Sequence, residues 1–575
     1  ISNYYLSFFY RLSIRDVSSL SDQPILSPCN RYVVSFNGEI YSFDNINNFK
    51  FPIKKSDTLS LVELLSKKGI KALHHLRGMF AISIFDKLEN TTYLVRDQFG
   101  IKPLFFSLKS ERNAKNYLIS CSEIKALSEI IDLKIFDFRQ AARYLKMGVS
   151  FDSADTFFSN IKLVKPGYIY KFDKNNKLVS EDKLENNLDS INLDSSKKYD
   201  SEAHCNVLND VLKDHFISDV PISSTISGGI DSSLISIALN KCSSREIKAY
   251  TLKSNKFDSE LSEEIKAKLN PLSITELEIS SDEMSLENII SVIKKLNYPI
   301  RTSSWLLIDK LFKEIKLKNK TKVILVGEGG DELYSGYKRL INPYLFCLNA
   351  DKRYSDFENS IDNFSHKFNT EKDQIIYGYE KFLNNLYQLT DYEDSKYWNI
   401  FDDKLKSINE RHLPGISFFK KIDKNTELFY KSNLKRYYQR SLIPSDLMIL
   451  DNLSMSYGLE LRVPLIDIKL FKYVMKYSYI HHFQGGFNKY MLRDASQGTP
   501  DLIRWNPHKK QRPNLNSFIV YDLHKDFIRD LLLQSEFLNN KLAVKLFEKD
   551  MFDRNDSSSD FWFRLTTFSI FHSLY

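Results

Sequence analysis

The stretch SGGIDSS at Ser227–Ser233 stands between an apolar run, VPISSTI at 220–226, and a helical pattern, SSLISIALN at 232–240. A strand, a glycine turn and a helix in this order predict a parallel α/β unit. Glycines let the backbone approach a ligand closely, and unpaired N–H groups at a helix start favour a phosphate. We therefore predict a phosphate-binding turn in which Asp231 is able to hold Mg²⁺. The alternative is a plain glycine turn with a serine helix cap.

A second glycine-rich turn, GEGGDE at Gly327–Glu332, follows the apolar run KVILV at 322–326. Ligands of open α/β sheets bind beyond the carboxyl ends of the strands, so we expect both turns to line one crevice. Carboxylates among glycines suit a metal or a reacting group. The alternative for this second turn is an exposed acidic loop.

Composition divides the chain into a β-rich front part and an alternating α/β rear part. We predict a front α+β domain over 1–172 and a linker over 173–200, where Asn, Asp, Ser and Lys dominate. The remainder, 201–575, is predicted to be a parallel-sheet α/β domain. Its last part, from about residue 342, has a mostly helical pattern rich in Tyr, Phe and Leu.

The length of 575 residues predicts more than one domain, and 42% hydrophobic with 27% charged residues is typical of a soluble globular protein. The net charge of +8 is mild for this length and argues against nucleic-acid binding. No apolar run is long enough for a membrane span, and no signal peptide is evident, so we expect a cytoplasmic protein. The five cysteines lack zinc-ligand or disulfide spacing: Cys29, Cys121, Cys205, Cys242 and Cys347.

Four motifs in order resemble the synthetase domain of asparagine synthetases, which belongs to the ATP pyrophosphatase group. They are SGGIDSS, GEGGDELYSGY at 327–337, the segment from Asp451 to Asp467 with LELRVPLID, and KYMLR at Lys489–Arg493. The resemblance implies that ATP activates a side-chain carboxylate, typically that of aspartate, as an acyl-adenylate with release of pyrophosphate. Ammonia then attacks the acyl-adenylate. ATP and Mg²⁺ are the expected cofactors.

The resemblance also implies roles for single residues. Asp231 and Asp331 would contact Mg²⁺ or pyrophosphate, Glu328 would lie near the reacting carboxyl, and Lys489 would offset developing negative charge. Tyr337 is a weaker candidate for proton transfer, and Arg462 is expected to be structural. The expected ATP-binding residues are Thr225, Ser227, Gly228, Gly229, Asp231, Ser232, Ser233, Leu252, Val326 and Gly327.

The front domain resembles the class II glutamine amidotransferase half of the same enzymes. This implies an Ntn-type fold of αββα layers whose first strand is missing from the sequence. Arg11, in RLSI, would bind the glutamine carboxylate through its guanidinium. Asn37 and Gly38, in NGEIY, would form an oxyanion hole. Glu39 and Asp57 would bind the substrate ammonium, while Arg96 and Asp97 are expected to be structural.

The family's nucleophile, an N-terminal cysteine, has no match here, since the sequence starts with Ile1 and Cys29 lies after the RLSI segment. One explanation is that the sequence is a fragment, which we favour because a lost sheet strand would expose apolar surface. The other is a dead glutaminase whose enzyme uses free ammonia. The 575 residues as given are expected not to hydrolyse glutamine.

Three functions compete on this evidence. The first is asparagine synthesis with aspartate and glutamine or ammonia as small-molecule substrates. The second is the same chemistry on another carboxylate, such as a cell-surface sugar acid. The third is a non-catalytic scaffold, against which the intact glycines and carboxylates argue. Neither a nucleic acid nor a membrane is an expected partner, and a homodimer is left as an open expectation.

Overall fold

The computed structural model describes the chain with internal gaps, and everything below concerns the described residues. They are 5–43, 56–110, 116–133, 136–151, 154–193, 197–244, 246–254, 262–269, 272–318, 320–387, 400–401, 425–439, 446–507, 518–553 and 556–575.

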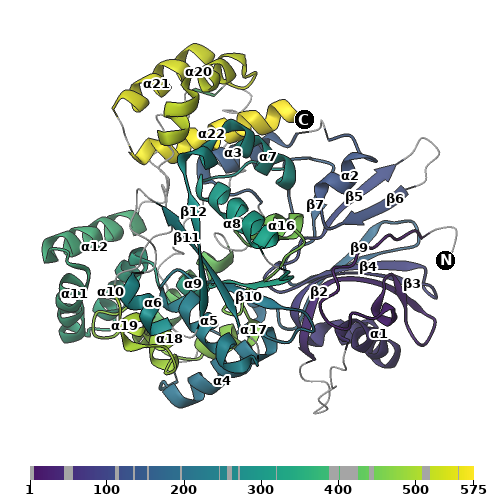
Figure 1. Cartoon of the computed structure of the whole chain (residues 1–575), viewed down its shortest axis with the longest axis horizontal. Coiled ribbons are helices and arrows are strands. Elements are labelled where there is room, and N and C mark those ends of the chain that lie inside the picture. The colour runs from purple at the N-terminus through teal and green to yellow at the C-terminus, as the bar shows by residue number, and fades with distance from the viewer. Residues whose placement is uncertain are drawn as a thin grey trace.

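The front domain is built from two antiparallel sheets between helices (Figure 1). The larger sheet has the order β1-β2-β3-β4-β8-β9, and the smaller has the order β6-β5-β7. Apolar residues of the larger sheet face helix α1 on one side and the smaller sheet on the other. The domain therefore has the predicted αββα layers. The strands and helices are β1 (Ile25–Leu26), β2 (Tyr32–Phe43), β3 (Leu76–Asp86), β4 (Thr91–Arg96), β5 (Phe105–Ser110), β6 (Asn116–Cys121), β7 (Lys162–Leu163), β8 (Tyr168–Phe172), β9 (Leu178–Lys183), α1 (Asp57–Lys68), α2 (Ile124–Ser128) and α3 (Phe138–Met147).

The rear domain is centred on a five-stranded parallel sheet with the order β12-β11-β10-β13-β14. From β10 the chain winds outward to β11 and β12, then returns through α7 and α8 to β13 on the other side of β10. The strand order thus reverses between β10 and β13, which is where ligands of such sheets bind. The elements are β10 (Ile222–Thr225), β11 (Lys248–Ser254), β12 (Ser273–Ile279), β13 (Val323–Leu325), β14 (Glu460–Arg462), α4 (Ser201–His215), α5 (Ile230–Cys242), α6 (Glu263–Leu269), α7 (Leu286–Leu296) and α8 (Ser304–Lys318).

The last third is largely helical, as predicted, and it packs around the carboxyl edge of the parallel sheet and over α7 (Figure 1). Its described helices are α9 (Gly330–Leu333), α10 (Ile341–Ala350), α11 (Tyr354–Phe368), α12 (Lys372–Tyr387), α15 (Thr426–Tyr437), α16 (Met448–Ser456), α17 (Ile468–Val474), α18 (Tyr490–Ala495), α19 (Asp501–Arg504), α20 (Phe518–Gln534), α21 (Asn540–Phe552) and α22 (Asp556–Leu574). Among these described helices, none combines the length and apolar character that crossing a bilayer requires.

Two segments differ from the sequence prediction. Residues 178–183, inside the predicted linker, form β9, which pairs antiparallel with β8 and closes the larger sheet. Leu184 and Leu188 behind it are buried, so a poorly packed linker is wrong for this part. The mostly polar and exposed side chains of β9 are typical of an edge strand. Residues 460–462, in the part predicted to be helical, form β14 beside β13.

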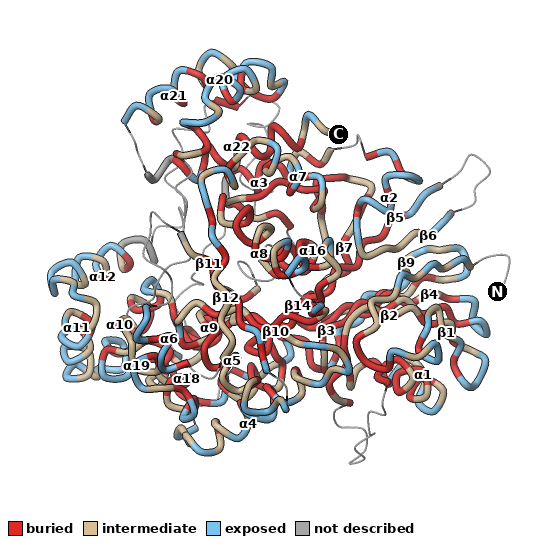
Figure 2. The backbone as a smooth tube through the Cα atoms, in the orientation of Figure 1, coloured by how far each residue is buried: buried red, intermediate tan, exposed pale blue. Residues whose placement is uncertain are grey.

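One hydrophobic cluster includes buried residues of both domains, and Figure 2 shows buried segments where the two domains meet. Phe99 of the front domain packs against Tyr438 and Phe471 of the rear domain. At the far end, Tyr144 on α3 contacts Thr567 on α22 through their hydroxyl groups, 3.0 Å apart. An apolar interface of this kind fixes the relative position of the domains.

Candidate active site

The two glycine turns meet at the reversal point of the parallel sheet. β10 and β13 are neighbours, with Ser224 opposite Leu325, so the turns leave the same sheet edge. A Cβ atom added at Gly327 would lie 2.8 Å from the Ser232 nitrogen, and one added at Gly330 would lie 2.4 Å from Asp231 Oδ1. The second turn therefore packs directly on the first, so the two turns lie together at one sheet edge, as predicted. That they line a ligand crevice stays a prediction.

The first turn leaves the start of α5 without a side-chain cap. Gly228 has φ +74°, which suits glycine, and Gly229 is the helix N-cap. Ser232 Oγ accepts a hydrogen bond from the Ser227 nitrogen at 3.0 Å and so shapes the turn. Ser233 Oγ is buried and has no hydrogen-bond partner among the described residues. A buried hydroxyl of this kind, at a helix start, fits a phosphate.

Lys489 joins the two turns from a distant part of the chain. Its Nζ lies 2.8 Å from Asp331 Oδ1 and also contacts Asp231, and the side chain is buried. Burial lowers the pKa of Lys489, but the two carboxylates outweigh it and hold the pKa above its ordinary value. Gly336 leaves the room for this contact, because a Cβ there would lie 1.9 Å from Asp331 Oδ1 and 2.2 Å from Lys489 Cε.

The loop that carries Lys489 is held by Asn488 and Arg493. Asn488 Nδ2 donates to the Gly336 carbonyl at 2.7 Å, and the Arg493 guanidinium donates to the Asn488 carbonyl at 2.7 Å and to its Oδ1 at 3.1 Å. Lys489 itself has a left-handed backbone with φ +52°, just before α18. Sequence reasoning assigned no role to Asn488 or Arg493. The motif KYMLR includes Arg493, but the contact from Asn488 to Gly336 joins residues 152 positions apart, so no local pattern predicts it.

The two carboxylates fit a magnesium ion bound together with phosphates. No group of three or more His, Cys, Asp or Glu side chains suited to a metal occurs in the described part of the chain. Asp231 and Asp331 face the same point, where Lys489 lies. Mg²⁺ commonly takes one or two protein carboxylates and completes its shell with phosphate oxygens and water. This donor set suits such an ion and does not form a closed protein cage.

Tyr337 and Glu332 form a polar pair beside this cluster. Tyr337 Oη donates to Glu332 Oε1 at 2.7 Å. Burial, followed by the charge of Asp331, raises the pKa of Glu332 to about 7. Burial also raises the pKa of Tyr337, next to Glu332. Glu332 was missed in the sequence, where it was only part of the acidic turn.

The remaining predicted nucleotide residues lie around the strand ends. Thr225 is the last residue of β10, and the buried Leu252 lies on β11 next to it in the sheet. The Val326 nitrogen donates to the Arg462 carbonyl at 3.1 Å. Glu328 lies half-buried in the second turn. Their contacts with a nucleotide stay predictions.

The residues of β2 and α1 that are predicted to bind glutamine come together in the front domain. Asn37, Gly38 and Glu39 follow one another on β2, and Asp57 begins α1. Asp57 accepts hydrogen bonds from the Ile40 nitrogen at 3.0 Å and from the Thr58 nitrogen at 2.8 Å. Gly38 has φ +131°, and a Cβ there would lie 1.9 Å from the Met79 carbonyl oxygen. Asn37 Nδ2 lies 3.5 Å from Ser122 Oγ.

Arg11 is placed differently from the other glutamine-site residues. Its guanidinium donates to the Ser18 carbonyl at 2.7 Å and to the Arg15 carbonyl at 3.2 Å, and it contacts the Asp16 carbonyl. It also pairs with Asp22 at 3.0 Å. Arg11 thus holds its own loop together here, and its binding of a glutamine carboxylate stays a prediction.

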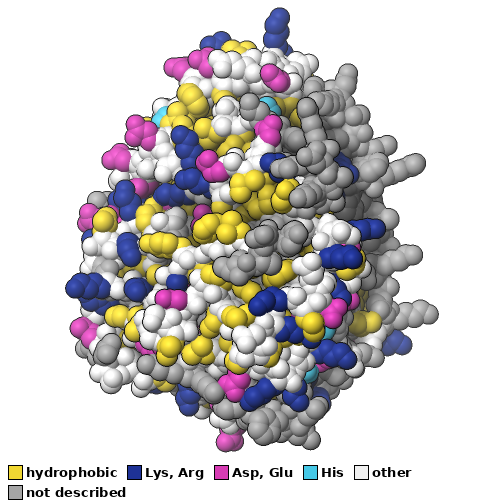
Figure 3. Space-filling model, turned by 90° about the vertical axis from the view of Figure 1, so that its right-hand side faces the viewer, with side chains coloured by type: hydrophobic (Ala, Val, Ile, Leu, Met, Phe, Trp, Pro, Cys, Tyr) yellow, Lys and Arg dark blue, Asp and Glu magenta, His cyan; other side chains and the backbone are white. Residues whose placement is uncertain are grey.

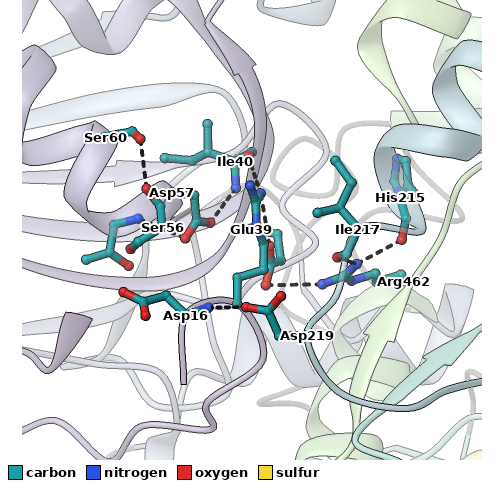
Figure 4. A network of polar contacts seen from close by, with 12 residues as sticks. Asp16, Glu39, Ile40, Ser56, Asp57, Ser60, His215, Ile217, Asp219 and Arg462 are labelled. Atoms are coloured by element: carbon teal, nitrogen blue, oxygen red, sulfur yellow. Dashed lines mark hydrogen bonds and ion pairs between the residues drawn. The ribbon is translucent and has the colours of Figure 1, made fainter. Parts of the chain in front are cut away.

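Glu39 is enclosed by two arginines, one of them from the rear domain (Figure 4). Glu39 Oε1 lies 3.1 Å from an Arg462 Nη atom, and Oε2 lies 3.6 Å from an Arg15 Nη atom. Burial raises the pKa of the Glu39 carboxyl well above its ordinary value, and the charges of Arg462 and Arg15 offset this only in part. Arg15 was missed in the sequence.

Arg96 and Asp97 are structural, as predicted. The buried Arg96 guanidinium donates to the carbonyls of Gly100, Lys102 and Val164. Asp97 accepts from backbone nitrogens of the same loop.

Family models match both halves of the chain. The asparagine synthase model matches residues 205–573. The chain belongs to the asparagine synthase family. A glutamine amidotransferase domain model matches residues 5–182. The expected two-part family architecture is therefore confirmed.

Curated relatives are similar at low identity. Asparagine synthetase (glutamine-hydrolyzing) 1 of Bacillus subtilis (strain 168) is 24% identical, over 98% of this chain and 89% of that protein. Asparagine synthetase (glutamine-hydrolyzing) 2 of the same organism is 28% identical, over 58% of this chain and 46% of that protein. Asparagine synthetase B (glutamine-hydrolyzing) of Escherichia coli (strain K12) is 26% identical, over 57% of this chain and 56% of that protein. The chain thus spans about half the length of the last two.

Among solved structures, glutamine phosphoribosylpyrophosphate amidotransferase from B. subtilis matches 53% of this chain and 64% of its own at 13% identity. Its TM-score of 0.19 is too low to support any statement about function.

Proposed function

We propose that this member of the asparagine synthase family converts aspartate to asparagine through β-aspartyl-AMP, with ammonia as the nitrogen donor, which the glutamine-hydrolyzing relatives obtain from glutamine. The observation that carries the proposal is the position of Lys489 between Asp231 and Asp331, at the meeting point of the two turns. Mg²⁺ dependence, a cytoplasmic location and a homodimer remain predictions.

The first chemical step joins the acceptor carboxylate to the α-phosphorus of ATP. An O–P bond forms, the bond between the α- and β-phosphates breaks, and pyrophosphate leaves with the electron pair. The N–H groups at the start of α5 and the Ser233 hydroxyl are placed to hold the leaving phosphates. A bound Mg²⁺, held by Asp231 and Asp331, would neutralise phosphate charge.

Among the described residues, Lys489 is our candidate for offsetting the charge of that step. A preorganised cation stabilises developing negative charge most strongly in a site that excludes water, and Lys489 is only 4% exposed. Its raised pKa keeps it charged at neutral pH. Asn488, Arg493 and Gly336 hold it in position.

The second step releases AMP. Ammonia attacks the acyl carbon, a C–N bond forms, the C–O bond to AMP breaks, and the nitrogen loses a proton. Tyr337 donates a hydrogen bond to Glu332, which directly follows Asp331 in the chain. The Glu332 pKa of about 7 allows either protonation state at neutral pH. We propose this pair as the proton acceptor.

The test is pyrophosphate release by the 575-residue chain from ATP, Mg²⁺ and ammonium, with aspartate and then with other carboxylates. We expect release that requires aspartate, and a rate about 10²–10³-fold lower in Lys489→Met. Lys295→Met serves as the matched control, because Lys295 pairs with Asp309 at 2.7 Å outside the site. Pyrophosphate release with another carboxylate but not with aspartate would mean that the other carboxylate is the substrate. No pyrophosphate release with any carboxylate would overturn the enzyme assignment.

A further inference from the structure

Arg462 is the residue through which the rear domain reaches the predicted glutamine site. Its side chain is fully buried on β14. The guanidinium lies 3.1 Å from Glu39 Oε1, and Nε donates to Glu460 Oε1 at 2.8 Å. It also donates to the carbonyls of His215 at 2.8 Å and Ile217 at 2.7 Å. In Figure 4 Arg462 and Glu39 point toward each other from opposite domains.

The backbone of the same residue supports the nucleotide turn. The Arg462 carbonyl accepts the Val326 N–H at 3.1 Å. Val326 directly precedes Gly327, which packs on Ser232 and Asp231 of the first turn. Arg462 thus contacts Glu39 of the predicted glutamine site with its side chain. With its backbone carbonyl it contacts Val326, which leads into the predicted nucleotide-binding turn.

The position of Glu39 depends on this contact for electrostatic reasons. The buried cluster holds two guanidinium groups, of Arg15 and Arg462, and three carboxyl groups, of Glu39, Asp57 and Glu460. A buried carboxylate needs a paired cation because water cannot solvate it. The planar guanidinium has a fixed donor geometry, so a displacement of Arg462 also displaces its acceptors.

We propose that Arg462 is a positioning residue that couples the glutamine site to the nucleotide site. Nucleotide binding at the Gly327 turn fixes the position of Val326. Because Val326 is hydrogen-bonded to the Arg462 carbonyl, and the Arg462 guanidinium is paired with Glu39, the position of Glu39 is fixed as well. The inference rests on the proposed function, because it takes Glu39 as part of the glutamine site. By linkage, glutamine changes the affinity for nucleotide by the same factor as nucleotide changes the affinity for glutamine.

Calorimetric titration of the 575-residue chain tests the coupling. Glutamine is titrated with and without a saturating, non-hydrolysable ATP analogue and Mg²⁺, and the analogue is titrated with and without glutamine. We expect the two ratios of dissociation constants to agree and to differ from one by about fivefold or more. Arg462→Lys keeps the positive charge but loses the planar guanidinium with its several fixed N–H donors. We expect both ratios to move close to one in this variant.

Arg77→Met is the matched control. Arg77 is another buried arginine across the domain interface and pairs with Asp467 at 2.8 Å. Among the described residues it forms no hydrogen bond or ion pair with Glu39 or Val326. We expect it to lower stability and to leave the ratios unchanged. Equal loss of coupling in both variants would show that the interface as a whole is responsible, which overturns the role of Arg462.

A measurement on the unsubstituted chain keeps the test decisive where Arg462→Lys does not fold. Hydrogen exchange at the amides of Glu39 and Ile40 is expected to slow when the analogue is bound. Glutamine binding that is indifferent to the analogue, with unchanged exchange, overturns the coupling alone. Absence of glutamine binding overturns the proposed glutamine site and the coupling with it, while aspartate-dependent pyrophosphate release would still stand.

Discussion

Lys102 Nζ lies 2.7 Å from Asp451 Oδ1, and this ion pair between the front and rear domains is shielded from water, with side-chain exposures of 0% and 2%. Burial lowers the pKa of Lys102, but Asp451 and Glu460 raise it above its ordinary value. When two charges are buried together, removal of one leaves the other without water or a partner to compensate its charge, and this destabilises the protein. The pair is therefore a sensitive point of the domain interface.

Removing one partner of this pair is expected to destabilise the protein. Lys102→Met leaves Asp451 buried without its cation, and we expect a loss of about 3–5 kcal/mol in the free energy of unfolding. Denaturant titration measures it. The double variant Lys102→Met/Asp451→Leu should recover a large part of the loss, since no charge remains unpaired. A single variant as stable as the parent would show that water reaches the pair.

The room left by Gly336 is expected to be essential for activity. Gly336→Ala places a methyl group at 1.9 Å from Asp331 Oδ1 and 2.2 Å from Lys489 Cε, so the lysine must move. We expect pyrophosphate release to fall by about 10²-fold or more, because the cation leaves its position. Gly378→Ala is the control, since its Cβ would meet only ordinary contacts, 3.8 Å from Asn342. Equal rates in both variants would contradict the assigned position of Lys489.

The two aspartates are expected to act in nucleotide turnover. Asp231→Asn and Asp331→Asn each remove one charge facing Lys489. We expect a higher Mg²⁺ requirement and a rate reduced by about 10-fold or more in each, because charge-assisted contacts to metal and phosphate weaken. Steady-state pyrophosphate release over a range of Mg²⁺ concentrations measures both effects. Unchanged turnover in both variants would remove the basis of the proposed site.

Glu332 gives the stability a defined pH dependence. Its folded-state pKa of about 7 lies above the ordinary glutamate value of 4.5. The folded protein therefore retains a proton that the unfolded chain has already lost between about pH 4.5 and 7. The contribution of Glu332 to stability is full below pH 4.5 and falls as the pH rises through that window, by about 3 kcal/mol.

Glu332→Gln removes this contribution, because the amide does not titrate. We expect the difference in unfolding free energy between parent and variant to change across pH 4.5–7 and to stay constant above it. Denaturant titrations at several pH values measure it. A difference that does not vary with pH would mean that Glu332 titrates normally.

Much of the local structure at the proposed nucleotide site could be predicted from the sequence, because strand, glycine turn and helix are encoded within a few residues. SGGIDSS and GEGGDE each have this local order, and the structure brings them together at the sheet edge. The αββα layers and the helical last third also agreed with local patterns and with the family resemblance.

The features that were missed depend on pairing between distant segments. β14 is three residues long, and only its pairing with β13 makes it a strand. β9 is polar because it is a solvated edge, and its composition is the same as that of a linker. The contact between Arg462 and Glu39 joins residues more than 400 positions apart, so no local pattern encodes it.

The face of the molecule shown in Figure 3 carries both basic and acidic side chains. In Figure 3 lysine and arginine side chains are interspersed with acidic ones on the face shown, with hydrophobic side chains between them. This distribution agrees with the mild net charge of +8. Such a face presents no single-sign electrostatic field to a polyanion.

The core that both domains share has a consequence for how such a gene can change. The buried Phe99 packs against Tyr438 and Phe471 of the rear domain, and the buried Tyr144 contacts Thr567 on α22. A gene divided between the two halves would produce fragments with exposed aromatic surface, each prone to aggregate until it met the other. Dividing this gene is therefore expected to favour production of both halves together and in matching amounts.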